Sequence, residues 1–329
     1  PILGTLTAIW AMKDYDVDET KALEVRALIA KRKEPKPSGY GANSIFGGLD
    51  LKGLSKIKLL EKYPTYFNTG IDIDVLGKEA INEKFNEVFA QKMHGICFTP
   101  YIENQNPGDT ITEEQIRKRL NVLVNHTYWI RVFSCTEGHE LIPGIAKEMG
   151  FKVMMGAWIG KDTERNNREI TSLLKLMKQG NVDIACVGNE VLFRGDQTEE
   201  TILNYIKQVK SNAAGIPVCY VDTYYEYINH PRLVEASDKV LINGYPFWEG
   251  AHIEHAGFYL QEMYNKTKAI ANGKEIMITE TGWPGNGDIS GDAVPNEVNQ
   301  MLYFIEAQSW AAHAGVKLFY FSSFDEAWK

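Results

Sequence analysis

Two glutamates stand where a carboxyl group could act as an acid or a nucleophile. Glu190 follows the apolar run 184–188, and Glu280 follows the mostly apolar run 275–279. A charged side chain directly after a buried strand is costly unless it has a partner or a function. Each glutamate alone could equally form a salt bridge at the rim of the fold. As a pair, they match the two carboxyl groups that cleave a glycosidic bond.

Glycosidic cleavage needs one carboxyl group as an acid and the other as a base or nucleophile. The acid must hold its proton near neutral pH, through burial or through the charge of its partner. A separation of roughly 5–5.5 Å between the two groups would give retention, and roughly 6.5–9.5 Å would give inversion. The residues alone leave both outcomes open.

Aromatic side chains gather in the segments that carry the glutamates. A flat aromatic ring can bury the apolar C–H face of a sugar and leave the hydroxyls to polar partners. Trp158, Trp248 and Trp283 come just after predicted strands, so we expect them to be sugar platforms, while core packing would explain about half of the whole set. That set is Tyr101, Trp158, Tyr224, Tyr225, Tyr245, Phe247, Trp248, Trp283, Phe324 and Trp328.

The elements that must position these residues alternate between strand and helix from about residue 95. Polar loops and amphipathic segments separate the strand-like runs, a pattern typical of βαβ units and a parallel sheet. Ile170, Leu173, Leu174 and Met177, for example, have helical spacing. The runs number about eight, which predicts a closed (β/α)8 TIM barrel in the α/β class. They are 95–100, 129–133, 152–157, 184–188, 218–222, 240–243, 275–279 and 317–321.

The first part of the chain does not follow this alternation. Ile81, Phe85, Val88 and Phe89 form one helical stripe there, but the segment has few other apolar residues in a helical pattern. We expect residues 1–92 to be an N-terminal extension that packs on a catalytic barrel of residues 93–329. A separate small domain is the alternative.

Composition excludes several classes of partner. The chain has 329 residues and a formal net charge of −8, so it offers no basic face for the phosphates of a nucleic acid. Its apolar runs are far shorter than the roughly 20 residues of a membrane span. It begins at Pro1 without the features of a signal peptide, which fits either a cytosolic protein or a trimmed mature form. We expect a monomer.

Cysteine and histidine spacing gives no strong sign of a metal or cofactor. Cys97, Cys135, Cys186 and Cys219 lie in or beside apolar runs without a CxxC pair, so buried free thiols are expected, with disulfides as the alternative. The segment 252–255, HIEH, places two histidines three apart, but a solvated helix start explains it better because zinc needs three or four ligands. We expect no metal and no cofactor.

The residues around both glutamates resemble glycoside hydrolase family 17, the β-1,3-glucanases and β-1,3-glucanosyltransferases, especially their microbial branch. The resemblance covers about residues 93–329. It implies a (β/α)8 fold and a retaining double displacement on β-1,3-glucan, with Glu190 as acid/base and Glu280 as nucleophile. It also favours a secreted or cell-wall location. Four motifs in the family's order carry it: 187–196, VGNEVLFRGD; 245–250, YPFWEG; 279–284, TETGWP; and 324–329, FDEAWK.

The resemblance also implies roles for residues beside the glutamates. Asn189 would hydrogen-bond the 2-hydroxyl of the sugar under attack, and Tyr101 and Tyr245 would hold the nucleophile. Glu326 and Lys329 match a terminal acid and base that support the site. The segment 97–101, CFTPY, departs from the Asn-Tyr-Gly type of first strand common in the family. With Trp158, Phe247, Trp248 and Trp283, these residues form the expected sugar-binding set.

The fate of the glucosyl-enzyme intermediate separates two activities that share the same glutamates. Water would give a hydrolase, and a sugar hydroxyl would give a glucanosyltransferase. We favour transfer, because an aromatic acceptor platform would hold sugar in place of water. Hydrolysis is the alternative, and a non-catalytic glucan-binding barrel is a more distant one. The short loops after the fourth and sixth strands leave no room for an extra subdomain, which favours small oligosaccharides.

Overall fold

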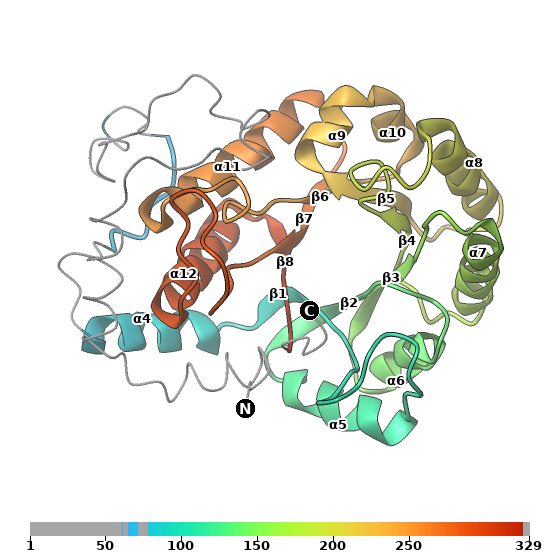
Figure 1. Ribbon diagram of the computed structural model, residues 1–329, viewed down its shortest axis with the longest axis horizontal. Coiled ribbons are helices and arrows are strands. Elements are labelled where there is room, and N and C mark those ends of the chain that lie inside the picture. The colour runs from blue at the N-terminus through green and yellow to red at the C-terminus, as the bar shows by residue number, and fades with distance from the viewer. Residues whose placement is uncertain (1–60, 62–64, 72–77, 325–329) are drawn as a thin grey trace.

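The strands of the protein close into a barrel, seen end-on in Figure 1. The computed structural model describes residues 61, 65–71 and 78–324. Neighbouring strands are parallel and follow chain order, and β1 pairs with β8 to close the ring. All eight predicted runs coincide with strands, so the predicted (β/α)8 fold is confirmed. The strands are β1 Met93–Cys97, β2 Thr127–Val132, β3 Lys152–Ala157, β4 Ile184–Asn189, β5 Val218–Thr223, β6 Val240–Asn243, β7 Ile276–Thr281 and β8 Lys317–Tyr320.

Helices form the outer ring around these strands (Figure 1). On α7, the predicted stripe buries Ile170, Leu173 and Met177 against the barrel. At the start of α5, the Thr112 hydroxyl caps the helix by accepting a hydrogen bond from the Gln115 N–H at 3.1 Å. The helices are α4 Lys78–Ala90, α5 Glu113–Leu123, η1 His139–Leu141, α6 Ile142–Glu148, α7 Thr163–Lys178, α8 Glu199–Lys210, α9 Tyr224–Asn229, α10 Pro231–Ala236, α11 Ile253–Ile270 and α12 Glu297–Ala314.

A small core rich in sulfur fills part of the barrel, apart from the larger core between strands and helices. Its sulfur atoms come from residues on five different strands. All four cysteines of the chain are buried free thiols, as their apolar surroundings predict. Burial raises the pKa of Cys186 to about 12, so this thiol stays protonated and unreactive. The sulfur-bearing residues of this core are Cys97, Met154, Cys186, Cys219 and Met277.

The described part of the predicted extension lies against α11 and α12. The side-chain amide of Gln261 accepts from the Phe67 N–H at 2.8 Å and donates to the Phe67 carbonyl at 2.9 Å. The Thr69 hydroxyl donates to Glu306 at 2.6 Å, and Phe85 of α4 packs on Phe304. Residues 1–60 lie outside the described residues, so the boundary at residue 92 and the choice between extension and separate domain stay predictions. Among the described residues, no helix is both long and apolar enough to cross a membrane.

The pairing of β4 and of β6 with the next strand becomes irregular near their carboxyl ends, beside the site. The register of β4 against β5 shifts between Cys186 and Asn189, and that of β6 against β7 shifts between Ile242 and Asn243. Such irregularities change the direction in which the following side chains point. They fall at the end of the barrel where enzymes of this architecture place their active sites.

Candidate active site

The barrel brings Glu190 and Glu280 together. Glu190 directly follows β4, and Glu280 lies near the end of β7. The side-chain N–H2 of Asn243, the last residue of β6, lies 2.9 Å from Oε1 of Glu190 and 3.0 Å from Oε1 of Glu280. One amide nitrogen therefore joins the two carboxyl groups across the mouth of the barrel.

Glu280 lies in a set of donors that suits a negative charge. Arg131 on β2 donates to Oε1 at 2.5 Å, and the Tyr245 hydroxyl donates to Oε2 at 2.7 Å. The third donor is the Asn243 amide. Charge-assisted bonds of this kind favour an ionised carboxylate and fix its orientation. The Tyr245 contact is the one that the family resemblance implies.

Arg131 is a buried cation on β2 that contacts residues of both β4 and β7. Its side chain is only 3% exposed. Burial alone would lower its pKa, but the adjacent charge of Glu280 contributes to a net increase, so the guanidinium stays charged. Its second nitrogen donates to Oδ1 of Asn189 at 2.7 Å. Arg131 therefore links the residue before the predicted acid/base to the predicted nucleophile.

Glu190 differs from Glu280 in its surroundings. Burial and the negative charge of Glu280 raise the pKa of Glu190 to about 7, while the hydrogen bond from Asn243 acts in the opposite direction. A carboxyl group with this pKa keeps much of its proton at neutral pH. It is therefore suited to give a proton to a leaving oxygen, whereas Glu280 lies among three hydrogen-bond donors.

Sequence reasoning missed Arg131 and Asn243, although both touch Glu280. Arg131 is a charged residue inside an otherwise apolar strand, and that contrast was a usable signal. Asn243 ends β6 just before the segment 245–250, and its sequence position alone looks ordinary. The Thr279 hydroxyl donates to Oδ1 of Asn243 at 2.9 Å, which turns the N–H2 group toward the two carboxylates.

Four aromatic rings contact one another in series, from Trp248 through Phe247 and Trp283 to Tyr303, and we call this series the aromatic column. Trp248 is 49% exposed and lies edge-on to Phe247 at 4.9 Å between ring centroids. Phe247 in turn contacts Trp283 at 5.2 Å, and Trp283 contacts Tyr303 at 5.6 Å. Phe247 and Trp283 are buried, and the Trp283 indole N–H donates to the Val294 carbonyl at 3.0 Å. Their burial contradicts the expectation that they contact sugar directly, because the packing covers their faces. In this column, only Trp248 offers an exposed ring.

The remaining expected residues have different settings. Trp158 after β3 is half-buried, with the Arg194 guanidinium 4.5 Å from its ring centroid. Tyr101 is buried and packs edge-on against His139, so its predicted hydrogen bond to the nucleophile stays a prediction. Glu326 and Lys329 lie outside the described residues.

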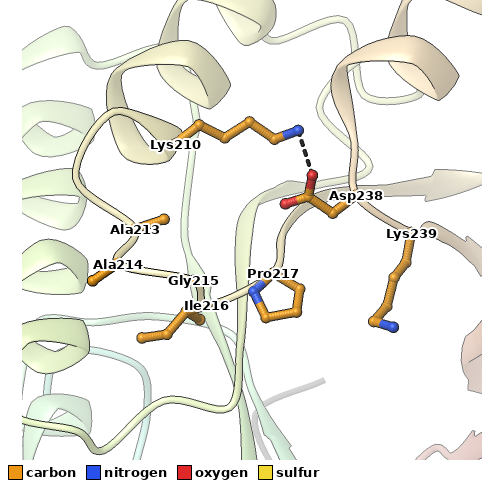
Figure 2. Close-up of a pocket in the computed structure, with 8 residues that line it drawn as sticks. All are labelled: Lys210, Ala213, Ala214, Gly215, Ile216, Pro217, Asp238 and Lys239. Carbon is orange, nitrogen blue, oxygen red and sulfur yellow. Dashed lines mark hydrogen bonds and ion pairs between the residues drawn. The ribbon is translucent and has the colours of Figure 1, made fainter.

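No alternative metal centre is found among the residues that the structure describes. His252 is the N-cap of α11, and its ring nitrogen accepts from the Glu254 N–H at 3.4 Å. The segment 252–255 is thus a helix start. The pocket in Figure 2 is remote from the two glutamates. Its lining residues come just before β5 and β6, so they lie at the other end of the barrel. Within this pocket, Lys210 forms an ion pair with Asp238 at 2.6 Å.

Comparisons with known proteins agree with this geometry. The family model of the BtgE/BtgC glycoside hydrolase domain matches residues 95–329. Cell surface mannoprotein MP65 of Candida albicans is 30% identical over 247 residues, which cover 71% of this chain and 62% of that protein. A glucan 1,3-beta-glucosidase of Arthroderma benhamiae is also 30% identical, over 68% of this chain and 77% of that protein. This chain thus matches less than two thirds of the length of the mannoprotein.

Solved structures give the same result. The crystal structure of a glycoside hydrolase family 17 beta-1,3-glucanosyltransferase from Rhizomucor miehei has 30% sequence identity and a TM-score of 0.66, and the match covers 73% of this chain and 90% of that one. An active-site mutant of the same enzyme, in complex with laminaritriose, matches equally well. The family model spans most of this chain. The chain therefore belongs to glycoside hydrolase family 17, as an enzyme with a domain of the BtgE/BtgC type.

Proposed function

We propose that this enzyme cleaves β-1,3-glucan by a retaining double displacement, with Glu280 as nucleophile and Glu190 as acid/base. The observation that carries the proposal is the asymmetry of the pair. Both carboxyl groups contact Asn243, but Glu280 also contacts Arg131 and Tyr245. One carboxylate is stabilised as an anion while the other is placed to hold a proton.

The distance between the two groups supports retention. Both oxygens lie within 3.0 Å of the Asn243 nitrogen, so the nearest carboxylate oxygens are at most about 6 Å apart. Retaining enzymes separate their carboxyl groups by roughly 5–5.5 Å, and inverting enzymes need roughly 6.5–9.5 Å to admit a water molecule. The limit of about 6 Å lies below the inverting range and so favours retention.

Each residue has a defined task in the two steps. Glu280 attacks the anomeric carbon, the glycosidic C–O bond breaks, and Glu190 gives its proton to the departing oxygen. Glu190 is then a carboxylate and removes a proton from the acceptor hydroxyl. That hydroxyl attacks the same carbon and releases Glu280. Asn189 is held beside Glu190 by Arg131, where it could bond the 2-hydroxyl of the sugar under attack.

We favour a sugar over water as the acceptor. The similar Rhizomucor miehei enzyme is named a beta-1,3-glucanosyltransferase, and laminaritriose is its bound ligand. Trp248 offers a ring that could hold an acceptor sugar, and Trp158 could hold another part of the chain. Hydrolysis is the alternative, which the name of the Arthroderma benhamiae relative favours.

A digest of laminaritriose separates these activities. The protein is incubated with the trisaccharide at several concentrations, and the products are sized by mass spectrometry. Products longer than the trisaccharide, rising with its concentration, indicate transfer, and only shorter sugars at high concentration would refute it. NMR of the first product should show the β-anomer, and an α-anomer would exclude retention.

Two variants test the roles of the glutamates. Glu280→Gln and Glu190→Gln should each lower turnover by about 10³-fold or more while trisaccharide binding is kept, because charge and proton are lost with little change in shape. Lys210→Gln, at the far end of the barrel, is the control and should act like the wild type. Normal turnover by Glu280→Gln would remove the proposed mechanism. Binding without any turnover by the wild-type protein would favour the glucan-binding barrel.

A further inference from the structure

The turn that carries Glu190 has an unusual backbone. Glu190 has a φ of +52° and Gly188 a φ of +87°. A side chain in this left-handed region is disfavoured, so neighbouring contacts must hold it. Gly188 allows the turn to close, because a Cβ there would lie 2.6 Å from the side chain of Val191. The orientation of Glu190 thus depends on the anchors of this turn.

Strand β5 supplies those anchors. The Glu190 N–H donates to the Val221 carbonyl at 2.9 Å. Two residues later, the Leu192 N–H donates to both the Tyr220 hydroxyl at 3.0 Å and Oδ2 of Asp222 at 3.2 Å. Tyr220 in turn donates its own proton to Oδ2 of Asp222. One backbone N–H therefore joins the acid/base turn to two side chains of the next strand.

Asp222 is a third carboxyl group, and it lies against the turn that carries Glu190. It is fully buried, and its other oxygen, Oδ1, accepts from the Thr223 N–H at 2.8 Å. The titratable groups around it are Tyr220 on its own strand, Glu226 and Tyr227 on α9, and Glu190 across the turn. None of these groups is a cation. The negative charge of Asp222 is therefore held by hydrogen-bond donors and acts on Glu190.

We propose that Asp222 is a positioning residue for Glu190, which anchors the turn through the Leu192 N–H and places a negative charge beside the acid/base. This inference rests on the proposed role of Glu190. The anchor fixes where the proton of Glu190 is delivered. The charge favours the protonated form, which the first step of the reaction requires. Burial raises the pKa of Asp222 to about 6, so the carboxylate is largely charged at neutral pH.

Asp222→Asn tests both parts because it keeps the shape and removes the charge. Its effect is read from kcat/KM for laminaritriose as a function of pH, where the basic limb reports loss of the Glu190 proton. Without the repulsion of Asp222, Glu190 ionises more easily, so the limb should move to lower pH by about half a unit. We also expect kcat to fall about tenfold, because the amide has one acceptor oxygen in place of two and cannot accept from both the Leu192 and the Thr223 N–H.

Asp238→Asn is the matched control. Asp238 also accepts a backbone N–H, that of Val218 at 2.8 Å, but at the opposite end of the barrel. Its basic limb should coincide with that of the wild type. A basic limb of Asp222→Asn that also coincides with the wild type would overturn the inference, because a structural role alone lowers activity without moving the limb.

Tyr220→Phe tests the anchoring of the turn if Asp222→Asn does not fold. It keeps the carboxylate but removes one acceptor of the Leu192 N–H, so kcat should fall several-fold with little change in KM. Unchanged kcat in this variant would refute the anchoring role. Failure of the proposed function is separate, because it would appear as normal turnover by Glu190→Gln, whereas failure of this inference leaves that variant inactive.

Discussion

At the scale of single residues, the site depends on one buried cation. Arg131 is nearly inaccessible to solvent and contacts Glu280 and Asn189 at once. A buried ion pair is not in itself a strong source of stability, because removing both ions from water is costly. Removing only one ion is much worse, since the other is left buried without its partner. The value of Arg131 therefore lies in pairing with Glu280, the proposed nucleophile, and fixing its position.

Arg131→Met should lower both activity and stability. We expect kcat/KM to fall by about 10²-fold or more, and the free energy of unfolding to fall by about 3 kcal/mol, because Glu280 loses its cation. Kinetics on laminaritriose and urea denaturation measure the two effects. Arg117→Met is the control: Arg117 pairs with Glu113 and Glu148 at the surface, so its loss should change stability far less. Equal effects of the two substitutions would contradict the role of Arg131.

At the scale of elements, the aromatic column shows how loops and helices support one exposed ring. Trp283 follows β7, Tyr303 belongs to α12, and Phe247 and Trp248 come from the loop after β6. The buried rings fix the loop, and the exposed ring is left to meet a ligand. Burial and exposure therefore assign different tasks to Trp283 and Trp248, although both follow strands.

Trp283→Ala and Trp248→Ala should consequently have different effects. Trp283→Ala leaves a cavity in the column and should lower the free energy of unfolding by about 3–5 kcal/mol. Trp248→Ala removes an exposed ring, so stability should change by less than about 1 kcal/mol, while transfer products decrease at a given trisaccharide concentration. Thermal or urea unfolding and product sizing give both results for each variant. A stable Trp283→Ala protein, or unchanged transfer by Trp248→Ala, would show that the tasks are assigned wrongly.

The same elements show what the sequence could and could not predict. Strands and helices follow from local apolar patterns, and Glu190 and Glu280 stand out because each follows such a run. Arg131 and Asn243 depend on contacts across the closed barrel, where residues 131 and 280 meet although 149 positions separate them. A local sequence pattern does not show how distant strands align with one another, so it cannot predict such contacts. Trp283 was misjudged for the same reason, since its burial depends on Val294 and Tyr303, which come later in the chain.

At the scale of the whole molecule, the site is a local cost to stability. Glu190 and Asp222 both have a raised pKa in the folded protein, chiefly through burial. Glu249, in the loop after β6, has its pKa raised to about 7 by burial as well. In the unfolded chain these groups ionise at their ordinary, lower values. Between these two ranges the three groups bind more protons in the folded protein than in the unfolded chain, so their contribution to stability falls as the pH rises.

Glu190→Gln should therefore be more stable than the wild type, and the difference should depend on pH. Above about pH 7 the wild-type glutamate is ionised in a partly desolvated site, so the variant gains about 1–2 kcal/mol in the free energy of unfolding. Below about pH 4.5 the glutamate is protonated in both states, and the two proteins should unfold alike. Urea denaturation at pH 5 and pH 8 measures the gap, with Lys210→Gln as a surface control. A difference in the free energy of unfolding that is constant with pH would mean that the ionisation of Glu190 is not what destabilises the fold. A smaller difference at pH 8 than at pH 5 would also contradict the prediction, because ionised Glu190 would then stabilise the fold. The expected result would show that Glu190, the proposed acid/base, lowers the stability of the barrel that holds it.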